Sequence, residues 1–137
     1  AIAVRKSMTF ICSFGASDEQ IKSVSDIFSR LGSVMIVDEN QMTACMALAS
    51  CGIAYAMRYV RAASEGGVEL GVKADLAKDI VLQTMQGAAA LLQATGAHPE
   101  AEIDKVTTPG GITIKGLNAM EAHGFTTSVI EGLKASK

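Results

Sequence analysis

The sequence has 137 residues, of which 49% are hydrophobic but only 4% aromatic, and its formal net charge is −2. A chain of this length forms one domain, or one domain and part of another. The lack of a basic excess argues against nucleic acid as a partner. No apolar run approaches the roughly 18 residues of a membrane span, and residues 1–6 lack a signal-peptide pattern. We therefore expect a soluble cytoplasmic protein that contacts neither nucleic acid nor membrane.

The cysteines and histidines do not form a recognisable chemical site. Cys12, Cys45 and Cys51 have no C-x-x-C spacing, and His98 and His123 do not stand at metal-ligand intervals from them. Neither histidine is close in sequence to a cysteine, which argues against a catalytic thiol. We expect free thiols in a reducing compartment and no metal site.

The first 40 residues alternate strand, helix and strand. Residues 7–12 are β-prone and predict a first strand. A capping box at Ser17–Gln20 begins a helix, which we expect to stop at Gly32. Residues 34–37 form an apolar run that predicts a second strand. This order is typical of a parallel βαβ unit. Because a stable sheet needs three or more strands or a covering partner, we expect this region to be the end of a larger domain and the chain to be a fragment.

From residue 41 onward the pattern is helical. We predict a helix over residues 41–64 that stops at Glu65–Gly67, and a second helix over residues 74–94 that stops at Gly96. His98 then opens a short helical turn. One further helix begins at Thr108, and a last helix follows Gly124. The long helices are apolar nearly all round, so about half of their faces would stay exposed in a monomer. We therefore expect a mainly α protein that forms a homodimer.

Residues 107–124 carry start and stop signals for one helix. Thr108 is predicted as the N-cap, Pro109 as the first helical residue and Gly124 as the left-handed stop. Gly110-Gly111 is unusual in a first turn, since each glycine costs about 1 kcal/mol relative to alanine. The pair either allows close packing against a neighbour or leaves backbone N–H groups free to bind an anion. The pattern alone leaves both interpretations open.

Three stretches together resemble the pyrroline-5-carboxylate reductases. The first has the family's C-terminal signature, V-[ST]-[ST]-P-G-G-x-T-x followed by E-x-x-G-F. The second is similar to the family's A-L-S-G-S-G-P-A-Y, and the third to its G-V-x-x-G turn. The residues that carry the resemblance are Val106–Ile114 with Leu117, Glu121, Gly124 and Phe125, then Ala47–Tyr55, and Gly66–Gly71.

The resemblance implies a two-domain enzyme. Residues 1–40 would be the βαβ end of a Rossmann domain, and residues 41–137 a helical bundle that dimerises and binds substrate, like the C-terminal domain of 6-phosphogluconate dehydrogenase. The implied reaction transfers hydride from NADPH or NADH to the C=N bond of 1-pyrroline-5-carboxylate, giving L-proline in the final step of proline biosynthesis. The implied assembly is a homodimer or a higher oligomer.

The resemblance also implies a substrate site near the dimer interface. The Thr108 hydroxyl and the backbone amides around Gly110 and Gly111 would bind the substrate carboxylate. Thr113 would be the catalytic residue, hydrogen-bonded to the ring nitrogen. These roles agree with the anion-site interpretation of the glycine pair.

The chain also departs from the family pattern. It has no G-x-G-x-x-G after a strand, so alone it should not bind NADP or NAD normally. Met46, Cys51 and Ile53 replace the family's usual residues, whereas Tyr55 matches and is expected to be a packing residue. Two alternatives therefore stay open: a non-catalytic helical dimerisation or regulatory module, and a reductase of a related cyclic imine.

Overall fold

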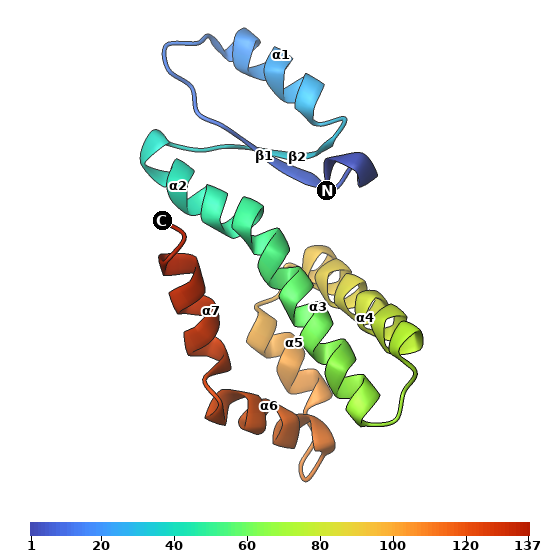
Figure 1. The fold of residues 1–137 in the computed structure, drawn as a ribbon. Helices are drawn as coiled ribbons and strands as arrows, with labels where there is room; N and C mark the ends of the chain where they lie inside the picture. The colour runs from blue at the N-terminus through green and yellow to red at the C-terminus, as the bar shows by residue number, and fades with distance from the viewer. The chain divides into compact units, whose positions relative to one another are not determined.

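The structure is a computed structural model that describes all 137 residues, and they form two compact units. The first unit is made of residues 1–53 and 133–137, and the second of residues 54–132. The chain is mainly helical and contains a single pair of strands near its beginning (Figure 1). The expected mainly α fold with an initial βαβ unit is confirmed. The domain boundary at residue 40 stays a prediction.

The βαβ unit begins after a short 3-10 turn, Ile2–Val4. Strands β1 (Ser7–Ile11) and β2 (Gly32–Ile36) pair in parallel, with Ser7 opposite Gly32. Helix α1 (Asp18–Phe28) connects them and lies beside the strands in Figure 1. No residue of this two-stranded sheet is fully buried, because its strands have few neighbours.

Helix α1 begins as its sequence predicts. Ser17 Oγ accepts a hydrogen bond from the Gln20 N–H at 3.3 Å, and Gln20 Oε1 accepts one from the Ser17 N–H at 2.9 Å. This reciprocal pair is the capping box, which satisfies two backbone donors that the helix cannot. A purely local signal was therefore sufficient to place this helix start.

The end of α1 differs from the prediction. The helix ends at Phe28 instead of continuing to Gly32, which is the first residue of β2. Leu31 O accepts hydrogen bonds from the Ser7 N–H at 3.1 Å and from Ser7 Oγ at 2.8 Å. Because Leu31 already pairs with β1, the helix ends before Gly32.

A long helical stretch follows β2. A 3-10 turn (Glu39–Gln41) leads into α2 (Met42–Met46), a π-helical turn (Ala47–Cys51) and α3 (Gly52–Glu69). The predicted helix is confirmed, but its stop at Glu65–Gly67 is wrong. The helix continues through both glycines and is followed by Gly71, whose φ is +93°.

Close packing of two helices explains why α3 passes through Gly67. A Cβ at this position would lie 3.0 Å from the Cβ of Ala77 in α4 (Ala74–Thr95). The glycine therefore lets α3 and α4 approach each other, as the side-by-side ribbons in Figure 1 illustrate. Ala77 is only 3% exposed, and it is one of the two buried residues of the chain, with Ala47.

Helix α4 has an inner and an outer apolar side. Ala77 faces α3, and the half-buried residues that recur with it at helical spacing are Val81, Met85 and Leu92. A second stripe, which we call the outer α4 stripe, consists of Leu76, Ile80 and Leu91, which are 55%, 51% and 47% exposed. Gly96, with a φ of +63°, ends the helix as predicted. The chain thus leaves one apolar side of α4 without a partner.

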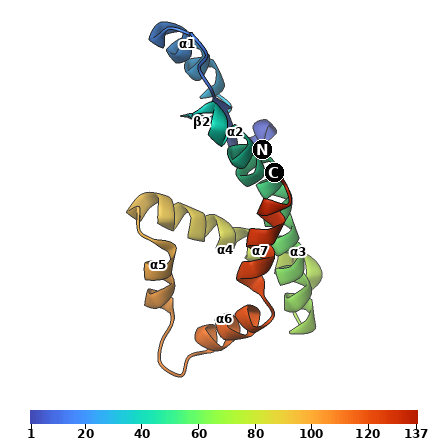
Figure 2. The same ribbon diagram turned by 90° about the vertical axis from the view of Figure 1, so that its left-hand side faces the viewer.

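Three shorter helices follow, namely α5 (Pro99–Val106), α6 (Ile112–Ala122) and α7 (Phe125–Lys134). His98 caps α5, its Nδ1 accepting a bond from the Glu100 N–H at 3.3 Å, so the predicted helical turn is confirmed. Gly124, with a φ of +77°, separates α6 from α7. Figure 2 shows the loop between α5 and α6 at the opposite end of α6 from this corner. None of the helices combines the length and hydrophobicity needed to cross a bilayer.

Candidate functional site

The candidate site is the loop between α5 and α6, together with the first turn of α6. The Gly111 N–H donates a hydrogen bond to Thr108 O at 2.9 Å, and Gly110 has a φ of +72°. With Pro109 at its second position, this geometry is that of a type II β-turn, which needs a positive φ at the third residue. The sequence therefore brings Thr108, Gly110 and Gly111 together in one tight turn.

This turn corrects the predicted start of the helix. Thr108 is not the N-cap and Pro109 is not the first helical residue, because α6 begins at Ile112 with Gly111 as its N-cap. Proline is favoured both at the first helical position and at the second position of a type II turn, so its presence alone does not distinguish them. Thr113 is consequently the second residue of the helix.

The two glycines are needed for different reasons. Gly110 adopts the left-handed conformation, although apart from the adjacent residues no atom lies within 4 Å of where its Cβ would be. At Gly111, a Cβ would lie 2.6 Å from Thr108 Oγ1 and 3.0 Å from Thr108 O. The close approach is thus within the turn and involves no neighbouring helix. The Thr108 hydroxyl lies directly against the N-cap residue of α6.

The start of α6 offers several hydrogen-bond donors. Gly111 has no side chain with which to cap the helix, and the first turn contains no acidic residue. The N–H groups of Ile112, Thr113 and Ile114 have no acceptor within the helix, and they lie at the positive end of its dipole. The Thr113 hydroxyl is exposed and makes no hydrogen bond within the chain. Such donors suit a carboxylate or another small anion.

This donor set is open to solvent in the single chain. Thr108 and Thr113 are exposed, and Ile112 between the turn and Thr113 is 86% exposed. Neither of the two grooves described below contains any of these residues. A closed pocket at this position therefore requires walls that residues 54–132 do not supply.

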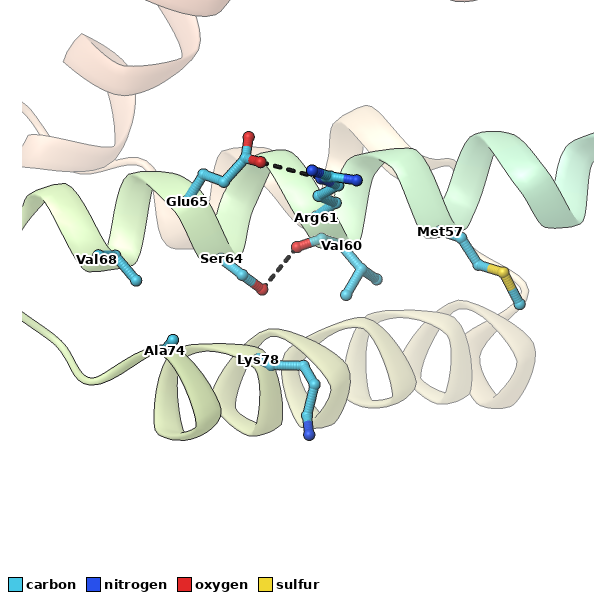
Figure 3. Close-up of a pocket in the computed structure, with 8 residues that line it drawn as sticks. All are labelled: Met57, Val60, Arg61, Ser64, Glu65, Val68, Ala74 and Lys78. Carbon is cyan, nitrogen blue, oxygen red and sulfur yellow. Dashed lines mark hydrogen bonds and ion pairs between the residues drawn. The ribbon is translucent and has the colours of Figure 1, made fainter.

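One groove lies between α3 and α4 and has a volume of about 470 Å³. Figure 3 shows the side chains of Val60, Ser64 and Val68 directed toward α4, while Arg61 and Glu65 form a 3.0 Å ion pair on the other side of α3. The pair is solvent-exposed and contributes little stability. The Ser64 hydroxyl is already bonded to Val60 O at 2.7 Å. The surface of the groove is mainly apolar, and its charged lining residues are Arg61, Glu65 and Lys78. Lys78 Nζ lies 3.4 Å from Asp79 Oδ1, so both cations of the groove already have an acidic partner.

A second groove, within the first unit, is lined by Cys12, Phe14, Glu39 and Met42. Its only charged lining residue is Glu39, which would repel a carboxylate. The three cysteines of the chain are free thiols. No group of three or more histidine, cysteine, aspartate or glutamate side chains is arranged to hold a metal ion.

The corner between α6 and α7 uses the Glu-x-x-Gly-Phe motif for packing. Glu121 Oε2 accepts a hydrogen bond from Thr126 Oγ1 at 2.7 Å, and Gly124 supplies the left-handed turn between them. Phe125 meets Tyr59 of α3 edge-to-face, with ring centroids 6.5 Å apart. These motif residues fix how α7 leaves α6, and none of them reaches the turn at the other end of α6.

Tyr55 also has a structural contact. Its hydroxyl donates a hydrogen bond to Gly132 O at 3.2 Å, which ties α3 to α7. Tyr55 as a whole is 39% exposed. The hydrogen bond supports the prediction of a packing residue, since it links two helices of the second unit.

The π-helical turn is a feature that sequence reasoning missed. The Gly52 N–H donates to Ala47 O, five residues earlier, in a stretch where an uninterrupted α-helix was expected. Met46 precedes this turn, Cys51 ends it and Ile53 follows it closely, so the three departures from the family pattern gather at one irregularity. π-turns occur often at functional sites. The only sign of the π-helical turn in the sequence is its small residues. That sign is not specific, because small residues also suit an ordinary α-helix.

Comparison with known proteins gives a consistent result. The family profile described as pyrroline-5-carboxylate reductase dimerisation matches residues 39–137. Pyrroline-5-carboxylate reductase 1 of Dictyostelium discoideum is 46% identical over 121 residues, which are 88% of this chain and 22% of that protein. The pyrroline-5-carboxylate reductase of Synechocystis is 38% identical over 118 residues, 86% of this chain and 44% of that protein.

Solved structures agree over almost the whole chain. The Plasmodium falciparum pyrroline carboxylate reductase, crystallised with NADP bound, has a TM-score of 0.91 and 28% identity, covering 97% of this chain and 54% of that one. A pyrroline-5-carboxylate reductase from Coxiella burnetii has a TM-score of 0.92 and 26% identity, covering 98% and 50%. The chain therefore spans about half or less of the length of these relatives.

Proposed function

We propose that this chain, which belongs to the pyrroline-5-carboxylate reductase family and carries its dimerisation domain, provides the substrate-carboxylate site and the subunit interface of such a reductase. The family resemblance read from the sequence is confirmed. The reaction proposed for the whole protein is reduction of the C=N bond of 1-pyrroline-5-carboxylate to L-proline. The observation that carries the proposal is the uncapped start of α6, with the Thr108 hydroxyl against it.

The substrate carboxylate is proposed to bind at the start of α6. Its two oxygens accept up to four hydrogen bonds, and the donors offered are the free amides of the first helical turn, the amides around Gly110 and Gly111, and the Thr108 hydroxyl. The Gly111 amide is already bonded to Thr108 O, so it contributes mainly its dipole. Backbone donors held by a type II turn and a helix need no rearrangement on binding, which favours affinity.

Thr113 is proposed to contact the reacting part of the substrate. It lies one residue beyond Ile112, close in the chain to the carboxylate donors, and its hydroxyl has no partner in the chain. A hydroxyl can donate a hydrogen bond to the imine nitrogen or accept one from its protonated form. Holding the ring nitrogen in one orientation raises the fraction of bound substrate that is ready to react.

The residues of this chain do not fit a dinucleotide site. The loop after β1 contains a single glycine, Gly15, and no G-x-G-x-x-G precedes α1. The Plasmodium relative was crystallised with NADP. We propose that NADP or NAD serves the whole reductase and is bound mainly by residues outside this chain.

A second copy of the chain is the proposed partner, in a homodimer. The outer α4 stripe, Leu76, Ile80 and Leu91, exposes apolar surface along one side of a long helix. Exposed large apolar side chains along a helix suit a protein interface. The matched family domain is a dimerisation domain, so the partner proposed is this chain itself, and higher oligomers are compatible with the same stripe.

Replacing Thr113 by valine in the full-length reductase tests the catalytic assignment. Valine keeps the shape of threonine but cannot hydrogen-bond, so kcat should fall at least tenfold, about 1.4 kcal/mol of transition-state stabilisation. Steady-state kinetics with 1-pyrroline-5-carboxylate measure the change. A Thr113→Ser variant should retain most of the activity because it keeps the hydroxyl.

Thr127→Val is the matched control, since Thr127 is likewise an exposed residue in the first turn of a helix, α7. Its kinetics should equal those of the unchanged enzyme. Unaltered kcat in Thr113→Val would remove Thr113 from the mechanism. If the unchanged enzyme did not reduce any cyclic imine, the non-catalytic alternative would be favoured. If it reduced other cyclic imines but not 1-pyrroline-5-carboxylate, the substrate would be one of those imines.

A further inference from the structure

A second threonine hydroxyl stands directly before the candidate site. Thr107 Oγ1 donates a hydrogen bond of 2.6 Å to Ile103 O, and the Thr107 N–H bonds to Asp104 O at 3.3 Å. Thr107 is half-buried, whereas its neighbour Thr108 is exposed. With φ −106° and ψ 106°, Thr107 is the residue at which the chain leaves α5 in an extended conformation.

The turn that follows Thr107 is not tied to another helix by hydrogen bonds. The bond inside it, from the Gly111 N–H to Thr108 O, joins two residues of the turn itself. Pro109 has no N–H to donate, and apart from the adjacent residues no atom lies within 4 Å of where a Cβ on Gly110 would be. The direction of the Thr108 hydroxyl therefore depends on how the chain leaves α5 and how it enters α6.

We propose that Thr107 is a positioning residue for the carboxylate site, a role that rests on the proposed function of that site. Its hydroxyl fixes the exit from α5 through a short bond to the last turn of that helix. Thr107 itself does not touch the substrate. It acts by keeping the Thr108 hydroxyl aligned with the free amides of α6.

Kinetics of the full-length reductase test this role. Thr107→Val removes the hydroxyl at nearly constant volume, and Thr107→Ser restores it. A displaced Thr108 weakens substrate binding more than the chemical step, so KM for 1-pyrroline-5-carboxylate should rise about fivefold to tenfold in Thr107→Val while kcat changes less than about twofold. Thr107→Ser should return KM to the unchanged value.

Thr95 provides a matched control for a merely structural effect. Its Oγ1 donates to Leu91 O at 2.9 Å, the same bond to the fourth residue before it, at the last residue of α4, and also accepts a bond from the Ala97 N–H at 3.2 Å. Thr95→Val should therefore lower the melting temperature at least as much as Thr107→Val but should leave KM unchanged. An equal rise of KM in both variants would show general destabilisation and would overturn the positioning role.

Thr108→Val separates this inference from the proposed function. Raised KM in Thr108→Val and in Thr107→Val, with rescue by Thr107→Ser, supports both. Raised KM in Thr108→Val with unchanged KM in Thr107→Val overturns the positioning role alone. Unchanged KM in Thr108→Val overturns the carboxylate site, and the role of Thr107 with it.

Discussion

At the residue scale, the two glycines of the Thr-Pro-Gly-Gly turn determine the candidate site. Gly110 supplies a positive φ that other residues adopt only with strain, and Gly111 leaves room for the Thr108 hydroxyl. The turn thereby places that hydroxyl beside a helix start without a side-chain cap. The geometry of this turn depends on the absence of a Cβ at each glycine, and an alanine substitution tests that requirement.

Gly111→Ala tests the steric requirement. The added Cβ would lie 2.6 Å from Thr108 Oγ1, so the hydroxyl must move away from the start of α6. We expect KM for 1-pyrroline-5-carboxylate to rise about tenfold or more in the full-length reductase. The control is Gly116→Ala within α6, where nothing lies within 4 Å of the new Cβ.

Gly116→Ala should stabilise the helix by about 0.5–1 kcal/mol and leave KM unchanged, because alanine is the better helix former. Thermal unfolding and steady-state kinetics measure the two effects. Unchanged KM in Gly111→Ala would mean that the Thr108 hydroxyl is not part of the binding site.

The same turn shows what sequence reasoning can and cannot decide. The Thr-Pro-Gly-Gly stretch was singled out from the sequence because two adjacent glycines after a proline are unusual at a helix start, and its role as a site stays a prediction. Its conformation was wrong by one turn, since threonine and proline suit both an N-cap with a first helical residue and the beginning of a type II turn. Only the backbone geometry, with φ +72° at Gly110, distinguishes them.

At the scale of secondary-structure elements, local signals were reliable and context-dependent ones were not. The capping box at Ser17 and the left-handed glycines Gly96 and Gly124 were correctly predicted, because each acts through its own backbone. Gly32 and Gly67 were wrongly taken as helix stops. They allow close approaches between separate elements, β1 with β2 and α3 with α4. A single sequence does not reveal which elements pack against each other.

Gly32→Ala tests the role of one of these glycines. A Cβ at residue 32 would collide with the backbone of Ser7, the residue opposite it in the parallel pair. We expect protection of the Ser7 amide against hydrogen exchange to fall at least tenfold, about 1.4 kcal/mol of local opening free energy. Amide exchange followed by NMR measures it.

Ser33→Ala, at an exposed position of the same strand, is the control for that measurement. It should leave the protection of the Ser7 amide within about a factor of two, as expected of a surface substitution. Equal protection in the Gly32→Ala variant would contradict the parallel register, in which Ser7 and Gly32 are opposite each other.

At the scale of the whole molecule, the chain buries few of its residues completely. Ala47 and Ala77 are its only buried residues, and both are small. The first unit has a sheet of two strands, fewer than an independent sheet normally needs. The second exposes the outer α4 stripe and the candidate site. Both features are consistent with an assembly in which other surfaces cover them.

We expect light scattering of the 137-residue chain to give the mass of two chains. The Ile80→Glu variant should give the mass of one chain. Ile80 is 51% exposed in the middle of the outer α4 stripe, and burying a charge there in a dimer would be costly. Gln86→Glu adds the same charge outside that stripe and should leave the dimer intact. A monomeric unchanged chain would contradict the proposed interface.

The central claim is that the start of α6 binds the substrate carboxylate. A crystal structure of the full-length reductase with L-proline tests this claim most directly. We predict that the proline carboxylate lies about 3 Å from the first free amides of α6 and from Thr108 Oγ1, with the ring nitrogen near Thr113. Proline bound elsewhere, with the start of α6 covered by protein, would contradict the account.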